Sequence, residues 1–157
     1  MTVNVFAAAK RLATRSGWTL TNLEMQKILY LAHMFYLGRT GGQPLVAGEF
    51  EAWDYGPVHP TLYHKIKIYG SEPVGNVFHS IPDIPDIPDI PDGPEASIID
   101  EAYDGLGKIG ASRLVKVTHR IRGAWAKHSK AGERRCKMPN ADIMQECIDL
   151  DSENDGD

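Results

Sequence analysis

The chain has 157 residues, 42% of them hydrophobic, which is enough for one domain with a sizeable core and too little for two. No apolar stretch approaches the ~20 residues of a membrane-spanning helix, and the N-terminus lacks the pattern of a secretory signal, so we expect a cytoplasmic protein without membrane contact. The net charge of −4 would repel phosphate backbones at long range, and two cysteines, Cys136 and Cys147, offer no disulfide framework or metal-type pairing.

The first predicted element is an amphipathic helix that runs to about Ser16. Thr2 or Asn4 can cap its start, and Gly17 is expected to end it. The helical period comes from apolar residues at positions 5, 6, 9, 12 and 13.

A second helix is predicted to begin after Thr21 and to end at Leu37, with Gly38 as its stop. Thr21 and Glu24 form a capping box, in which each side chain satisfies a backbone amide at the start of the helix. Apolar residues wrap most of this helix, so we expect it at the centre of the core.

Polar residues occupy one narrow sector of the second helix, namely Gln26, Lys27 and His33, with Tyr30 close by. We interpret this sector as the edge of the helix that faces water. The alternative is a polar strip that reaches into a cleft or a partner.

A short extended segment is predicted from Glu49 to Trp53, where acidic and apolar residues alternate. Trp53 and Tyr55 then face the same side, and we expect both to pack in the core beneath a turn formed by Gly56 and Pro57. The alternative is that these two aromatic side chains anchor a protein partner, since Trp and Tyr are enriched at interface hot spots.

A third helix is expected to begin at Pro60, because the missing N–H of proline would be unsatisfied at a helix start anyway. Gly70 is expected to stop it. Its core face consists of three residues: Leu62, Ile66 and Tyr69.

Residues 81–92 repeat Ile-Pro-Asp four times. A proline in every third position favours polyproline II, which also has three residues per turn, so the isoleucines line one edge and the aspartates another. Such a ribbon is able to dock in the aromatic groove of a partner. The simpler interpretation is a tandem expansion in a tolerant surface loop, because the entropy of loop closure grows slowly with length.

Three further helices are predicted over residues 96–106, over residues 112–122 and over a last short stretch that ends near residue 148. The acidic residues 149–157 are expected to form a disordered tail. The sequence therefore predicts a mainly α fold of about six helices in a single compact domain over residues 1–148, with a short extended segment near residues 49–53.

The segment 108–137 is basic: it holds ten Lys or Arg residues and one acidic residue, whereas residues 138–157 hold seven acidic residues and no base. The simplest interpretation is that the basic side chains meet this acidic tail or lie on an exposed helix face. The alternative is an anionic partner. The candidate partner-binding residues are Arg113, Lys116, Arg120, Arg122, Arg134 and Arg135.

Catalytic chemistry has little support in the sequence. The six histidines include no pair at i, i+4 spacing and no H-E-x-x-H motif, and no glycine-rich phosphate-binding loop occurs. Cations next to Cys136 favour a reactive thiolate, but no base partner is identifiable. We therefore expect no enzyme activity, no metal and no cofactor.

Two motifs mark the region 20–69: a helix with the run Gln26-Lys27-Ile28-Leu29-Tyr30, and the segment Ala52-Trp53-x-Tyr55-Gly56-Pro57-Val58. Thr118, His119 and Trp125 follow downstream. With these motifs the chain, from about residue 3 to residue 148, resembles the Panacea domain family, to which SocA-like antitoxins and GepA-type proteins belong. The signature residues implied by this resemblance, mainly structural in role, are Lys27, Tyr30, Trp53, Tyr55, Gly56 and Pro57.

The resemblance implies an antitoxin, a helical domain that neutralises a co-encoded toxin by direct protein contact. The SocA-like branch further implies an adaptor that presents the toxin to the ClpXP protease. The alternative from the residues alone is a small DNA-binding transcriptional regulator that uses the basic segment 108–137, although the acidity of the chain argues against a nucleic-acid partner. The Ile-Pro-Asp repeat has no counterpart in the family pattern, so the resemblance assigns it no role.

Overall fold

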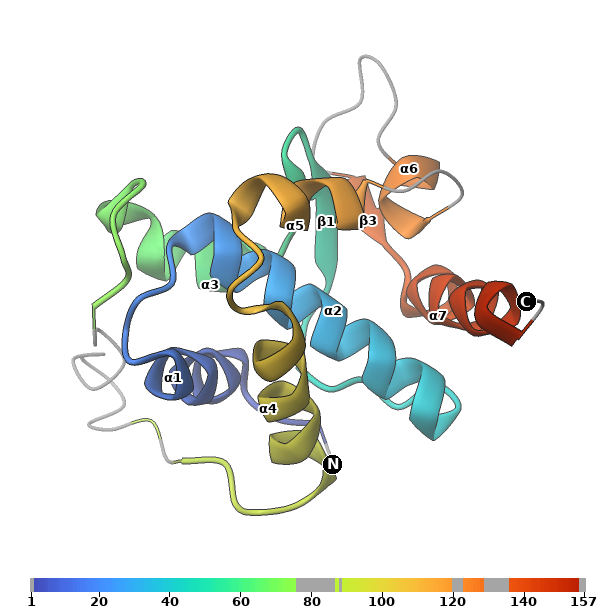
Figure 1. The fold of residues 1–157 in the computed structure, drawn as a ribbon, viewed down its shortest axis with the longest axis horizontal. Helices are drawn as coiled ribbons and strands as arrows, with labels where there is room; N and C mark the ends of the chain where they lie inside the picture. The colour runs from blue at the N-terminus through green and yellow to red at the C-terminus, as the bar shows by residue number, and fades with distance from the viewer. Residues whose placement is uncertain (1, 76–86, 88, 120–122, 129–135, 156–157) are drawn as a thin grey trace.

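A long central helix is surrounded by shorter helices and a small sheet (Figure 1). The computed structural model describes residues 2–75, 87, 89–119, 123–128 and 136–155, without the side chains of residues 151–155. Within this part of the chain there are seven α-helices, one 3-10 helix and one three-stranded sheet. The mainly α fold class is confirmed, and the helices exceed the expected number because the region after residue 118 contains a separate short helix.

Helix α1 (Val5–Ser16) begins and ends where the sequence predicts. The side chain of Asn4 accepts hydrogen bonds from the amides of Phe6 and Ala7, which would otherwise lack partners in the first turn. Gly17 ends the helix with φ of 70°, the left-handed conformation that glycine adopts without steric cost.

Helix α2 (Asn22–Thr40) is the central element and packs against α1, α4, α5, α7 and the sheet (Figure 1). The capping box between Thr21 and Glu24 is present. The predicted stop at Gly38 is wrong, because the helix continues and is capped by Gly41. Gly38 instead allows α7 to approach, since a Cβ atom there would overlap the Sγ atom of Cys147.

The predicted extended segment is strand β1 (Phe50–Trp53), the middle strand of an antiparallel sheet with the order β2-β1-β3. Its register with β2 (Gly56–Val58) pairs Trp53 with Gly56, so Asp54 and Tyr55 form the two-residue turn. The expectation of a Gly-Pro turn is therefore wrong, and Pro57 lies in an edge strand, where proline is tolerated. Strand β3 (Cys136–Met138) was not expected from the sequence.

Helix α3 (Pro60–Ile66) begins at Pro60 as predicted, and the 3-10 helix η1 (Lys67–Tyr69) continues it to Gly70. Leu62 and Ile66 are fully buried, which confirms most of the expected core face. Tyr69 is only partly buried and packs against the edge of the core.

The end of the Ile-Pro-Asp repeat is packed against its own domain. Ile87 and Ile90 are buried in the core, on the same edge as their three-residue spacing predicts. The Nζ atom of Lys10 donates a hydrogen bond to the Ile87 carbonyl and forms an ion pair with Asp89 at 3.1 Å. The expectation of a tolerant surface loop is wrong for this part of the repeat, while residues 81–86 and 88 lie outside the described residues.

The C-terminal half contains α4 (Pro94–Leu106), α5 (Ala111–Thr118), α6 (Ala124–His128) and α7 (Asn140–Asp155). Helix α5 ends earlier than predicted, and the backbone of α7 remains helical beyond residue 148, where a disordered tail was expected. No helix in the described part of the chain is long and apolar enough to cross a membrane.

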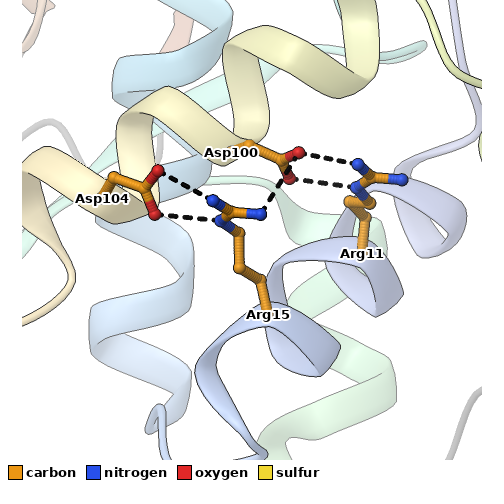
Figure 2. A network of polar contacts seen from close by, with 4 residues as sticks. All are labelled: Arg11, Arg15, Asp100 and Asp104. Carbon is orange, nitrogen blue, oxygen red and sulfur yellow. Dashed lines mark hydrogen bonds and ion pairs between the residues drawn. The ribbon is translucent and has the colours of Figure 1, made fainter.

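Helices α1 and α4 are joined by a network of ion pairs, the α1–α4 ion-pair face (Figure 2). Arg11 and Arg15 are four residues apart on α1, and Asp100 and Asp104 are four residues apart on α4, so the side chains meet one above the other. Each arginine makes two hydrogen bonds to one carboxylate, with distances from 2.6 to 3.0 Å. Arg15 also lies 3.5 Å from Asp100, which links the two pairs.

Candidate functional site

The polar sector of α2 is buried rather than facing water. Gln26, Lys27, Tyr30 and His33 are all 1% exposed or less, so the interpretation as a wet edge is wrong. The covering elements are the β1–β2 hairpin, the segment after α5, and α7, none of which can be placed against α2 from the helical pattern alone. The alternative was a strip that reaches into a cleft or a partner; of the four side chains, Gln26 and Lys27 line a pocket, and contact with a partner stays a prediction.

Three of these side chains have ordinary partners for buried polar groups. The amide oxygen of Gln26 accepts a hydrogen bond from the backbone N–H of His59 at 2.8 Å. Tyr30 donates one to Glu146 at 2.8 Å, and His33 is bonded to Asn140 at 3.0 Å. Burial lowers the pKa of His33 to about 4, so this imidazole is neutral and serves to connect α2 to the start of α7.

Lys27 differs, because no described residue supplies a countercharge for its buried ammonium. The Nζ atom donates a hydrogen bond to the carbonyl of Pro57 at 3.1 Å, and none of the described carboxylates lies within ion-pair distance. Burial lowers its pKa to about 7, so near neutral pH the group changes readily between its charged and neutral forms.

Gly56 makes room for this lysine. Its φ of 117° is open only to glycine at low cost, and a Cβ atom there would lie 2.7 Å from Cε of Lys27. The same Cβ would lie 3.0 Å from Oγ1 of Thr118 and 3.2 Å from Nε2 of His119. Side chains from three parts of the sequence therefore meet at one glycine. We call this cluster of Lys27, Gly56, Thr118 and His119 the Lys27 site.

His119 closes the site from the side of α5. Its ring stacks on Trp125 at 3.5 Å between centroids, and Trp125 donates a hydrogen bond to the Trp53 carbonyl at 2.7 Å. Burial lowers the pKa of His119, the nearby charge of Lys27 lowers it further, and a hydrogen bond to the Tyr55 backbone opposes both. Its Nε2 atom is buried without a hydrogen-bond partner, in the space next to Gly56.

A pocket of about 410 Å³ adjoins Lys27, between the start of α2, the hairpin and α3 with η1. We call it the aromatic pocket, because Trp53 and Tyr63 meet edge to face in its wall, with centroids 4.7 Å apart. Its lining residues are Asn22, Leu23, Gln26, Lys27, Trp53, Asp54, Tyr55, Val58, Tyr63, Lys67 and Gly70.

Tyr55 is 72% exposed on the hairpin turn, whereas Trp53 is partly buried. The expectation that both aromatic side chains pack in the core is therefore wrong, because Tyr55 is exposed and Trp53 lies in the wall of the pocket. The strand alternation stops at Trp53, because the two turn residues follow it and Tyr55 no longer shares its face. The position of Tyr55 at the mouth of the pocket is compatible with the alternative, an aromatic anchor.

The pocket includes residues that the sequence does not single out, above all Tyr63 and Lys67. Their contribution depends on α3 packing beside α2, a tertiary contact without a local signal. A usable signal did exist for Lys27. A lysine on a helix that is apolar around most of its circumference has little exposed surface available to it.

The candidate partner-binding residues of the basic segment are only partly described. Arg113 and Lys116 are exposed on α5, away from the lining of the aromatic pocket. Arg120, Arg122, Arg134 and Arg135 lie outside the described residues. A contiguous basic surface therefore stays a prediction.

The chemistry of the aromatic pocket suits binding. It combines apolar and aromatic walls with a small number of polar groups, the usual composition of a recognition site. The described residues include no cluster of three or more side chains able to hold a metal ion. The two cysteines, Cys136 and Cys147, are not joined in a disulfide.

Comparisons with known proteins agree with the motifs. The family described as antitoxin SocA-like, Panacea domain, matches residues 25–126, a range that contains Lys27, the hairpin and His119. The antitoxin SocA of Caulobacter vibrioides (strain NA1000 / CB15N) is 36% identical over 115 residues, which cover 68% of this chain and 58% of that protein. The chain thus spans less than two thirds of the relative's length. No solved structure gives a significant match.

Proposed function

The chain belongs to the SocA-like antitoxin family with the Panacea domain, and we propose that it is an antitoxin that neutralises a co-encoded toxin by direct protein binding. The observation that carries the proposal is the extent of the family match. It includes α3, the hairpin, α5 and all of α2 except its first turn, which are the elements that build the Lys27 site and the aromatic pocket.

Neutralisation by binding requires a complementary surface and no catalytic group. The aromatic pocket with an exposed tyrosine at its mouth supports such a surface. We therefore propose a protein-binding role without enzyme activity, cofactor or metal, in the cytoplasm where a toxin of this kind would act.

Co-expression with the product of the adjacent reading frame tests the antitoxin role. We expect that product to arrest growth when it is expressed alone, and growth to recover when this chain is expressed with it. We also expect the two proteins to co-purify. Unimpaired toxicity together with recovery of this chain alone would contradict the proposal.

The finer proposal is that this chain delivers the toxin to the ClpXP protease. It rests on the resemblance to the SocA-like branch alone, and no contact among the described residues specifies a protease. A chase experiment decides between degradation and occlusion. If the chain delivers the toxin, the toxin should be short-lived only when both this chain and ClpX are present. If growth recovers without ClpX and the toxin level stays constant, the chain neutralises the toxin by covering its surface instead.

The alternative of a DNA-binding regulator depends on the basic segment 108–137. Arg113 and Lys116 are exposed on α5, but they are two cations on a helix of eight residues. A gel-shift assay with the promoter of its own gene tests this alternative. Binding that falls steeply as salt rises would favour it over the antitoxin.

A further inference from the structure

The buried lysine of α2 needs an explanation that the fold does not supply. Lysines are almost never fully buried unless paired, because removing an ammonium from water is costly. Lys27 is 0% exposed, its Nζ atom donates a hydrogen bond to the Pro57 carbonyl, and burial rather than a neighbouring charge sets its lowered pKa. One carbonyl leaves other N–H donors of the ammonium for a further acceptor.

The lysine lies against the wall of the aromatic pocket, which gives that acceptor a route of approach. The pocket volume of about 410 Å³ falls in the usual range of about 300–1,000 Å³ for ligand sites. Lys67 also lines it, so two of its three charged lining residues are cations and only Asp54 is an anion. In a chain with a net charge of −4, this local excess of positive charge favours an acidic occupant.

Exposed apolar side chains occur in the pocket lining and next to it in the chain. Tyr55 on the hairpin turn is 72% exposed, and Ile68, next to Lys67 on η1, is 74% exposed. They are two of the four exposed large hydrophobic residues in the described part of the chain. Tyr55 lines the pocket, and Ile68 follows the lining residue Lys67 in the chain. Exposed apolar side chains around a concave site are typical of an interaction surface.

The geometry points to the aromatic pocket as the docking site of the toxin, an inference that rests on the proposed antitoxin function. The occupant is a toxin segment in which a large apolar side chain lies beside an Asp or Glu side chain. The apolar side chain packs among Trp53, Tyr55 and Tyr63, and the carboxylate becomes the countercharge of Lys27, with Lys67 at the rim. Lys27 is covered in the unbound chain, so docking includes a small movement of its side chain or of the hairpin turn.

Substitutions at three points of the pocket test this inference against a matched control. The variants are Lys27→Met, Tyr55→Ala and Lys67→Glu, and the control is Ile148→Ala, an exposed apolar residue on α7. The measurement is the Kd for the purified product of the adjacent reading frame. We expect each pocket variant to weaken binding by about tenfold or more and the control to change it by less than about twofold.

Folding and binding are separated by the choice of variants. Lys27→Met removes an uncompensated buried charge, so its melting temperature should equal or exceed that of the wild type while its binding weakens. Lys67 and Tyr55 are exposed, so their variants are expected to keep the fold. Full affinity in all three pocket variants would overturn the inference and leave the antitoxin function intact. If the wild-type chain does not bind the product of the adjacent reading frame, both the docking site and the proposed antitoxin function are contradicted.

A photo-crosslinking residue in place of Tyr55 identifies the occupant. The expected product is a toxin peptide with an Asp or Glu next to a large apolar residue. Replacing that acid by Lys should weaken binding, and the Lys67→Glu variant should restore part of it. A crosslinked segment without an acidic side chain, or one bound through the C-terminal carboxylate of the toxin, would overturn the proposal.

Discussion

Two regions of this domain differ in whether their charged side chains are paired. On the α1–α4 ion-pair face each arginine is held by a carboxylate, and the side chains remain partly in water (Figure 2). At the Lys27 site a lysine is fully buried, and the described residues provide only a carbonyl for it. The first arrangement stabilises the contact between two helices, whereas the second costs stability.

The magnitudes differ as well. Exposed ion pairs contribute roughly 0–1 kcal/mol, because water and salt screen the attraction. The lowering of the Lys27 pKa from 10.5 to about 7 corresponds to a cost on the order of 5 kcal/mol for the charged form in the folded chain. The ion pairs of the α1–α4 face are therefore accounted for by the contact between two helices, whereas Lys27 is the residue for which we infer a binding role.

The largest expected effect comes from closing the space around Lys27. Gly56→Ala places a methyl group within 2.7 Å of the lysine side chain and forces a φ of 117° on a residue with a Cβ. We expect the free energy of unfolding to fall by about 3–5 kcal/mol, measured by urea denaturation.

Gly41→Ala is the matched control for that substitution. Its φ is 71°, and no atom lies within 4 Å of the added Cβ. The loss there should be only about 1 kcal/mol, the cost of the left-handed conformation. Equal losses at Gly41 and Gly56 would show that Lys27 is not confined by the hairpin.

The second effect has the opposite sign. Lys27→Met removes the buried charge and keeps an unbranched side chain, so the free energy of unfolding at pH 7 should rise by about 2 kcal/mol. The lowered pKa means that the unfolded wild type binds more protons than the folded one between pH 7 and 10.5.

Stability of the wild type should therefore rise through this window, relative to the variant, by up to about 1.4 kcal/mol per pH unit. The difference in free energy of unfolding between Lys27→Met and the wild type therefore becomes smaller as the pH rises. His119, the other titratable group that faces Lys27, has a lowered pKa and titrates below this window. Denaturation curves at pH 7, 8 and 9 check the trend, and a constant difference would contradict the buried, uncompensated charge.

Much of the fold could be predicted from local rules. The cap at Asn4, the capping box at Thr21 and the proline start of α3 depend on residues within one turn of each other. Gly38 shows where such rules fail, because a glycine at the end of an apolar run indicates either a stop or a close helix contact. Only the position of α7 decides between them.

The candidate site could be predicted only in part. The motifs around Lys27, Trp53 and Gly56 indicate the family, but a helical pattern cannot show which side of α2 another element covers. Glutamine, lysine and histidine usually face water, which is why the sequence predicts a solvent-exposed edge for the polar sector of α2. Tyr63 and Lys67 join the pocket only through the packing of α3.

A smaller effect is expected on the α1–α4 ion-pair face. Arg11→Ala removes two hydrogen bonds to Asp100, whose side chain is 19% exposed. We expect a loss of about 1 kcal/mol, with a coupling energy of about 0.5–1 kcal/mol in a double-mutant cycle with Asp100→Ala. A coupling as large as the effect at Gly56 would contradict the distinction between paired surface charge and the Lys27 site.

The smallest effect is expected at the outer end of the same network. Arg15 and Asp104 are more exposed than Arg11 and Asp100, so water competes for both partners and salt screens them. Arg15→Ala should lower the melting temperature by less than Arg11→Ala does, and the difference from the wild type should shrink further in 1 M salt. The comparison is made by thermal denaturation at low and high salt.

Lys27→Met serves as the contrast, because a buried charge is screened little by salt. Its gain in melting temperature should therefore persist in 1 M salt, and loss of this gain would show that Lys27 is open to water.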